Sequence, residues 1–136
     1  MKNLIFGLCL LLIPLSLSAE IVVIGNLNSP VNNLSKREVQ DIFLGRTRAL
    51  PNGNFVLPLD LVELRSNFYL LLTNRPIEQI DAYWARIMFS GQNTPPINLP
   101  DEQAMLKTIA ENTGAIGYMD KRKINEKLVR VLLILE

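Results

Sequence analysis

The sequence contains no histidine and a single cysteine, Cys9, and these shortages exclude much catalytic chemistry. A Ser-His-Asp triad and a Cys-His pair both need histidine, and the usual zinc sites are built from histidine and cysteine. Acidic clusters of the DxDxDG kind, which bind calcium, are also missing. Paired carboxylates, a lysine or an oxygen-ligated metal stay open to an enzyme, because their members can lie far apart along the chain. No pattern favours any of these, so we expect no catalytic residue, no metal and no cofactor.

The chain begins with the features of a secretory signal peptide. Lys2 supplies a positive charge, residues 4–15 form an apolar run, and residues 16–19 supply the small side chains of a cleavage site before residue 20, or one residue earlier. The apolar run is short for a membrane span, and no second run follows it. We therefore predict that residues 1–19 are a cleaved signal peptide, that the protein is secreted to the periplasm, and that no integral membrane segment is left after cleavage.

Cleavage would change the composition of the protein. Removing residues 1–19 from the 136-residue chain would leave 117 residues, a normal size for one domain with its own core. The cysteine would be lost, and with it any disulfide. The chain carries 14 basic and 13 acidic residues, so the loss of Lys2 would leave 13 of each. A net charge near zero produces no overall field that favours nucleic acid. We predict one domain, residues 20–136, that binds no nucleic acid.

Periodicity and capping residues indicate a single α/β domain with a mixed sheet flanked by helices. Ser35 and Glu38 form the pattern of a capping box at the start of the first helix. A β-branched run at residues 21–24 is typical of a strand buried on both faces. Residues 92–100 hold three prolines and are predicted to be irregular. Helices are expected over residues 35–45, 61–72, 76–91 and 101–114, and strands over residues 21–24, 55–60, 115–119 and 128–135.

One tryptophan, two arginines and a short basic run each have two interpretations. Trp84 belongs to an apolar helix face and is expected in the core rather than on a binding platform. Arg46 and Arg48 follow the first helix, where they could contact an acidic partner or be solvated, and the solvated interpretation is favoured. The basic run at residues 121–123 is short for binding anionic lipid and is interpreted as a solvated turn.

Three stretches in the same order resemble one protein family: VQDIFLGRTRALPNGNFVLPLD at residues 39–60, DAYWARIMFSG at 81–91 and GAIGYM at 114–119. They resemble the phosphate-binding proteins of bacterial ABC transporters, especially their short secreted members. The resemblance implies a type-2 periplasmic-binding-protein fold. Full-length members have two lobes that close on phosphate and are more than twice this length, so the resemblance predicts a single lobe here.

The resemblance also suggests a ligand site, although the family pattern is only partly kept. In the long phosphate binders a strand runs into an arginine, and a Ser-Gly-Thr opens the next helix. Here the Ser-Gly-Thr positions fall on Leu64, Arg65 and Ser66, and the arginine position falls on Asp60. Amide groups at a helix N-terminus, together with Arg65, Ser66 and Asn67, would suit an anion. The alternative is that Asp60 caps the helix and Arg65 is solvated.

A second group of candidates follows the first strand, where α/β sheets commonly place their ligands. Asn28 and Ser29 lie in this loop, and ordinary turn chemistry is the alternative. Taken together, these features predict a non-enzymatic solute-binding protein for phosphate or another small oxyanion. The alternative is an interaction module without a ligand that binds another envelope protein or its own copy.

Overall fold

The computed structural model describes Gly7, residues 11–13 and residues 20–136. The predicted signal peptide, residues 1–19, therefore lies almost wholly outside the described residues and stays a prediction. All core residues among the described residues fall between Ile21 and Leu135, so residues 20–136 contain one hydrophobic core. No helix among the described residues is long and apolar enough to cross a bilayer.

A five-stranded mixed sheet forms the centre of the fold, in the order β3-β2-β4-β1-β5. The strand β1 (Ile21–Asn26) lies between β4 (Ala115–Asp120) and β5 (Val129–Leu135) and runs antiparallel to both. The strand β2 (Leu57–Leu61) runs parallel to β4 on one side and parallel to β3 (Ile97–Leu99) on the other. Every residue of β1 and β4 is buried, because helices cover both faces of the sheet. The predicted α/β fold with a mixed sheet is confirmed.

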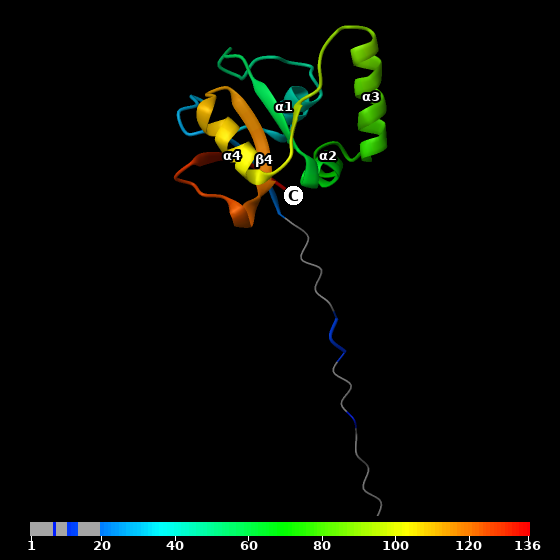
Figure 1. The fold of residues 1–136 in the computed structure, drawn as a ribbon, viewed down its shortest axis with the longest axis vertical. Helices are drawn as coiled ribbons and strands as arrows, with labels where there is room; N and C mark the ends of the chain where they lie inside the picture. Colours follow the sequence, from blue (N-terminus) through cyan, green and yellow to red (C-terminus); the bar gives the residue numbers. More distant parts are fainter. Residues whose placement is uncertain (1–6, 8–10, 14–19) are drawn as a thin grey trace, which may run out of the picture.

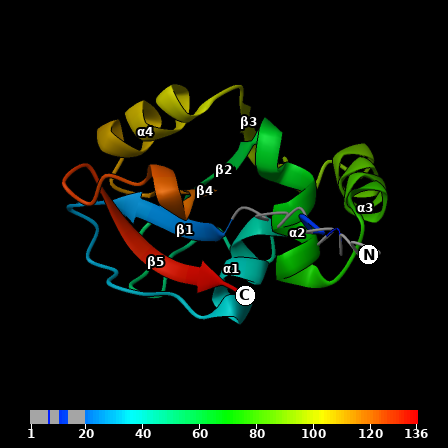
Figure 2. The same cartoon turned by 90° about the horizontal axis from the view of Figure 1, so that it is seen from below.

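The helices form two layers, one on each face of the sheet (Figures 1 and 2). Helix α4 (Glu102–Glu111) covers one face, and α1 (Lys36–Phe43) and α2 (Arg65–Thr73) cover the other. Helix α3 (Ile77–Phe89) packs on α2, farther from the sheet. A side chain at Gly117 in β4 would overlap the sulfur of Met105 in α4. The absence of a side chain there allows α4 to pack closely on the sheet.

Aromatic rings fill the layer between the sheet and helices α1 and α2. Phe68 of α2 stacks on Tyr118 of β4, with ring centroids 3.6 Å apart and an interplanar angle of 7°. Phe43 of α1 meets the edge of Phe68 at 4.8 Å, and Tyr69 meets Phe68 at 5.1 Å. All four rings are fully buried. They join α1, α2 and β4 into one core, and the pairs of Phe68 with Phe43 and Tyr69 have the edge-to-face geometry that aromatic pairs favour.

The start of α1 is formed as predicted. The Oγ of Ser35 accepts a hydrogen bond from the backbone N–H of Glu38 at 3.1 Å, and Oε1 of Glu38 accepts one from the N–H of Ser35 at 2.9 Å. These two bonds satisfy two of the amide groups that a helix N-terminus leaves free. Trp84 is buried, with 4% of its surface exposed, so its predicted place in the core is also confirmed.

The secondary-structure prediction was wrong in two places. Residues 92–100 are not wholly irregular, because Ile97–Leu99 form β3, a three-residue edge strand paired with β2. The helix expected over residues 61–72 is divided into a short 3-10 helix, η1 (Val62–Leu64), and α2. A second 3-10 helix, η2 (Lys121–Lys123), follows β4. Element order is therefore β-α-β-α-α-β-α-β-β, with one strand more than predicted.

Candidate functional site

Asp60 is a buried carboxylate near the end of β2, in the region where the resemblance places a ligand site. Its residue surface is only 2% exposed. Its Oδ1 accepts hydrogen bonds from the hydroxyl groups of Tyr69 at 3.0 Å and Tyr118 at 3.1 Å. Its Oδ2 accepts one from Nε of Arg65 at 3.2 Å. The carboxylate is thus held by groups from α2 and β4 and is not the cap of α2, as the alternative interpretation supposed.

Arg65 opens α2 and connects Asp60 to a second carboxylate. Its Nη1 lies 2.8 Å from Oδ1 of Asp81 on α3, and its guanidinium lies 5.5 Å from the centre of the Tyr69 ring. Only 20% of its side chain is exposed, against 56% for Asp81. Arg65 is therefore not the solvated residue of the alternative interpretation. It is one cation between two carboxylates.

Burial and these contacts change the proton affinities of the cluster. Burial raises the pKa of Asp60 above its usual value of 3.8, although Tyr69, Arg65 and Tyr118 all act to lower it. Burial and the nearby Asp60 carboxylate raise the pKa values of Tyr69 and Tyr118, so both hydroxyl groups stay protonated and act as donors. Burial opposes the charge of Arg65, but pairing with Asp81 and Asp60 raises its pKa overall.

The N-terminus of α2 is free of side-chain caps. Its N-cap residue is Leu64, which provides no capping hydrogen bond, and the first turn contains no acidic residue. Ser66 and Asn67 in this turn are both exposed. Amide N–H groups and the helix dipole make such a terminus favourable for an anion. This terminus is not fully open, because η1 leads directly into it and the N–H of Arg65 donates to the carbonyl of Val62.

Asn28 and Ser29 lie at the opposite end of the sheet from Asp60. They follow β1, which runs antiparallel to β4, so the last residues of β1 lie beside the first residues of β4. Strand β2 runs parallel to β4, so its first residues lie at this same end of the sheet and Asp60 lies toward the other end. Ser29 is buried, and its Oγ accepts a hydrogen bond from the N–H of Val31 at 3.3 Å. Asn28 is exposed. The structure therefore brings Asp60, Arg65, Ser66 and Asn67 together and leaves Asn28 and Ser29 apart from them.

Tyr69, Tyr118 and Asp81 complete the cluster around Asp60, and sequence reasoning missed all three. Tyr69 lies one helical turn after Arg65, which is a pattern that could have been noticed. Tyr118 is 58 residues from Asp60 in the chain, and Asp81 lies on another helix. Among the described residues, no group of three or more acidic or cysteine side chains could hold a metal ion.

The architecture is a single α/β domain with a mixed five-stranded sheet. No family model matches the sequence, and no curated protein matches it significantly. Solved structures do match. One, described as a phosphate ABC transporter substrate-binding protein with bound phosphate, from Clostridium perfringens, has a TM-score of 0.65 at 15% identity. The match covers 84% of this chain and 44% of that one.

Two further structures give the same result. An ABC-type phosphate transport receptor from Vibrio cholerae matches with a TM-score of 0.65 at 14% identity, over 84% of this chain and 45% of the receptor. A structure from Planctomyces limnophilus, described as a possible phosphate binding protein, matches with a TM-score of 0.60 at 9% identity, over 84% of this chain and 40% of that one. The predicted resemblance is confirmed at the level of the fold. The chain spans less than half the length of each of these three solved structures, which are described as binding proteins or a transport receptor.

Proposed function

We propose that this chain is a secreted, non-enzymatic solute-binding lobe of the cell envelope that binds a small oxyanion such as phosphate at the N-terminus of α2. The observation that carries the proposal is this helix start, which has no side-chain cap and no acid in the first turn of α2, although the preceding η1 contains Glu63. The fold is shared with structures described as phosphate-binding proteins. The periplasmic location and the link to ABC-transporter uptake belong to the same proposal.

The anion would be held mainly by short hydrogen bonds from the helix start. Backbone N–H groups of the first turn, the hydroxyl of Ser66 and the amide of Asn67 supply the donors. Arg65 lies beside them, oriented by Asp60 from behind. Asp81 occupies Nη1 of Arg65, so a bound oxyanion competes with this carboxylate for the guanidinium. We therefore expect weaker binding than in a protein whose arginine faces an open site.

This competition gives the proposal a two-sided test. Ser66→Asp places a negative charge in the first turn of α2, where it stabilises the helix but repels an anion, so phosphate affinity should fall. Asp81→Asn removes the competing carboxylate, so phosphate affinity should rise. Asp41→Asn is the matched control, because Asp41 pairs with Arg46 at 3.3 Å, away from α2. Asn28→Asp should leave affinity unchanged, because Asn28 lies at the other end of the sheet.

The measurement is a titration of residues 20–136 with phosphate and with sulfate, followed by calorimetry and thermal unfolding. Ligand at one hundred times its Kd should stabilise the fold by about 2.7 kcal/mol, which corresponds to a Tm rise of roughly 10 °C for a domain of this size. Absence of a shift with either anion in the wild type and in Asp81→Asn would falsify the proposal. A shift that Ser66→Asp leaves intact would place the anion elsewhere.

The second candidate function is a ligand-free interaction module that binds another envelope protein or its own copy. One observation favours it: Arg65 is already neutralised by two carboxylates. A chain spanning less than half of its structural neighbours also has a surface where the rest of those proteins would lie. Sedimentation of the purified domain tests the self-association form. A dimer that forms at micromolar concentration without any anion response would favour the module over the binding protein.

A further inference from the structure

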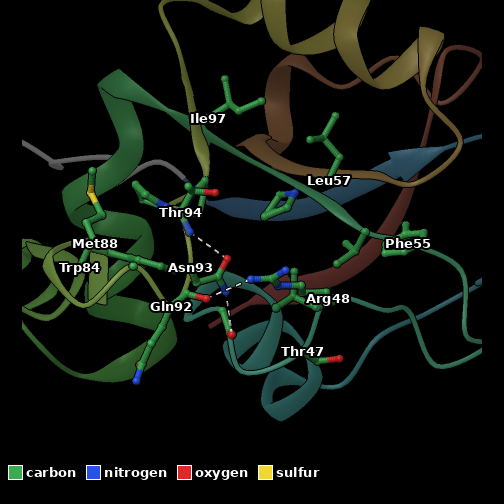
Figure 3. A pocket seen from close by; sticks show the side chains of 17 residues that line it. Thr47, Arg48, Phe55, Leu57, Trp84, Met88, Gln92, Asn93, Thr94 and Ile97 are labelled. Atoms are coloured by element: carbon green, nitrogen blue, oxygen red, sulfur yellow. Dashed lines mark hydrogen bonds between the residues drawn. The ribbon is translucent and has the colours of Figure 1, made fainter. Parts of the chain in front are cut away.

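An open hollow lies at the end of β2 opposite to Asp60, with a volume of about 640 Å³ (Figure 3). It lies between the loop that follows α1, the first residues of β2, and the segment that runs from the end of α3 to β3. Its volume falls in the range of sites for small molecules, about 300–1,000 Å³. The hollow is separate from the proposed oxyanion site, and the inference below does not depend on that proposal.

Apolar side chains form most of this hollow. Trp84 of α3 and Leu57 of β2 line it, and both belong to regular elements of the fold. Phe55, Met88 and Ile97 line it as well, with 84%, 54% and 51% of their surfaces exposed. Three large apolar side chains exposed around one hollow are unusual for a surface without a function.

Hydrogen bonds give the hollow a fixed shape. The side-chain amide of Asn93 donates to the carbonyl of Gly45 at 3.0 Å, and Nη2 of Arg48 donates to the carbonyl of Gln92 at 3.0 Å (Figure 3). These two bonds connect the loop after α1 to the segment after α3. Gly45 has a φ of +69°, and a Cβ added there would lie 2.6 Å from Cη2 of Trp84. The walls are therefore set before any ligand arrives, which reduces the entropic cost of binding.

Arg48 is the one ionisable residue among those that line the hollow. Its guanidinium has no carboxylate partner among the ion pairs of residues 20–136, whereas the neighbouring Arg46 is paired with Asp41. An arginine with free N–H groups beside apolar walls attracts a carboxylate, sulfonate or phosphate. The charge of the hollow therefore selects for an anionic group, and its walls select for an apolar body.

We infer that this hollow binds a small amphiphilic anion, with the apolar part against the exposed side chains of Phe55, Met88 and Ile97 and the anionic group on Arg48. Addition of a peptide strand to the neighbouring edge of the sheet is disfavoured. The edge strand β3 has three residues and follows Pro95 and Pro96, which lack N–H groups, and both features protect sheet edges from pairing. A free small molecule fits the volume and the single charge better than a strand does.

Two fluorescent probes with the same ring system test the inference on residues 20–136. Anilinonaphthalene sulfonate carries an anionic group, and N-phenylnaphthylamine lacks it. We expect one sulfonate probe per chain, bound about tenfold more tightly than the neutral probe, as a charge-assisted hydrogen bond would produce. Arg48→Gln should remove this preference and leave the neutral probe unaffected. Arg48→Lys should keep part of the preference.

The controls separate the hollow from other surfaces. Arg46→Gln should leave both affinities unchanged, because Arg46 does not line the hollow. Ser66→Asp should also leave probe binding unchanged, so loss of phosphate binding alone overturns only the proposed function. Equal affinities for the two probes in the wild type, or a preference that Arg48→Gln retains, overturns the inference. Sedimentation that shows a dimer with the hollow closed to both probes overturns it in favour of a second copy as the occupant.

Discussion

Nε of Arg65 lies 3.2 Å from Oδ2 of Asp60, five positions earlier in the chain, across the junction between β2 and α2. Both residues fall at positions where the resemblance to phosphate binders implies ligand contacts. In this chain they contact each other. The Asp60 carboxylate thus supplies the negative charge beside Arg65 that a bound anion would otherwise supply. This relationship is the main reason to expect weak oxyanion binding here.

The first prediction concerns the contribution of this pair to stability. Arg65→Gln would leave the Asp60 carboxylate buried without a cation and should lower the free energy of unfolding by about 1–3 kcal/mol. Asp81→Asn removes the exposed partner instead and should cost less than about 1 kcal/mol. Urea unfolding at pH 7 measures both. Equal costs for the two variants would show that the contact between Arg65 and Asp60 adds nothing to stability.

The second prediction concerns pH and two aspartates with opposite behaviour. The pKa of Asp60 is raised above 3.8, so the native state binds more protons than the unfolded state and this residue's contribution to stability falls as pH rises from 3.8 through the raised pKa. The pKa of Asp120 is lowered by its hydrogen bonds from Arg122, so its contribution is present above 3.8 and is lost as pH falls through the lowered pKa.

Asparagine variants isolate these two effects. The stability difference between wild type and Asp60→Asn should shrink as pH rises above 4, whereas the difference for Asp120→Asn should grow as pH rises from low values toward 4. Subtracting each variant from the wild type cancels groups that titrate equally in both. Parallel curves for the wild type and Asp60→Asn would mean that Asp60 has its ordinary pKa.

The third prediction concerns two glycines with the same backbone conformation and different surroundings. Gly45 and Gly91 both have a φ of +69°. A Cβ at Gly45 would lie 2.6 Å from Cη2 of Trp84 and 2.7 Å from Nδ2 of Asn93, whereas a Cβ at Gly91 would meet nothing within 4 Å. Gly91→Ala should cost about 1 kcal/mol from the backbone alone, and Gly45→Ala about 1–3 kcal/mol more. Similar unfolding midpoints for both variants would contradict this reading of the contact.

The fourth prediction concerns the indole of Trp84. Its Nε1 is buried and has no hydrogen-bond acceptor among the described residues. Trp84→Phe removes an unsatisfied donor, so the loss of packing should be partly offset, whereas Trp84→Ala should cost about 3–5 kcal/mol. Thermal unfolding of the two variants measures the difference. If phenylalanine costs as much as alanine, the N–H group has a partner in solution.

Local sequence rules predicted most of the elements. The capping box of Ser35 and Glu38 depends on four consecutive residues and is formed as expected. The apolar runs of β1 and β5 and the apolar spacing on α3 can also be recognised from neighbouring residues alone. The edge strand β3 has no such pattern, because three residues after two prolines show no periodicity. Their pairing with β2 produces the strand geometry. The sequence could not show that Asn28 and Ser29 lie far from Asp60 and Arg65, because strand direction cannot be derived from a single strand.

The sequence by itself determined the α/β class, the absence of histidine chemistry and the helix start at Ser35, because each depends on composition or on neighbours within a few residues. Only the tertiary structure decided what the charged residues do. Asp60 meets Tyr118 across 58 positions, Arg65 meets Asp81 from another helix, and Arg48 is left beside an apolar hollow. Such contacts depend on how strands and helices are placed in space, and side-chain charge alone does not specify the partner that each group will meet.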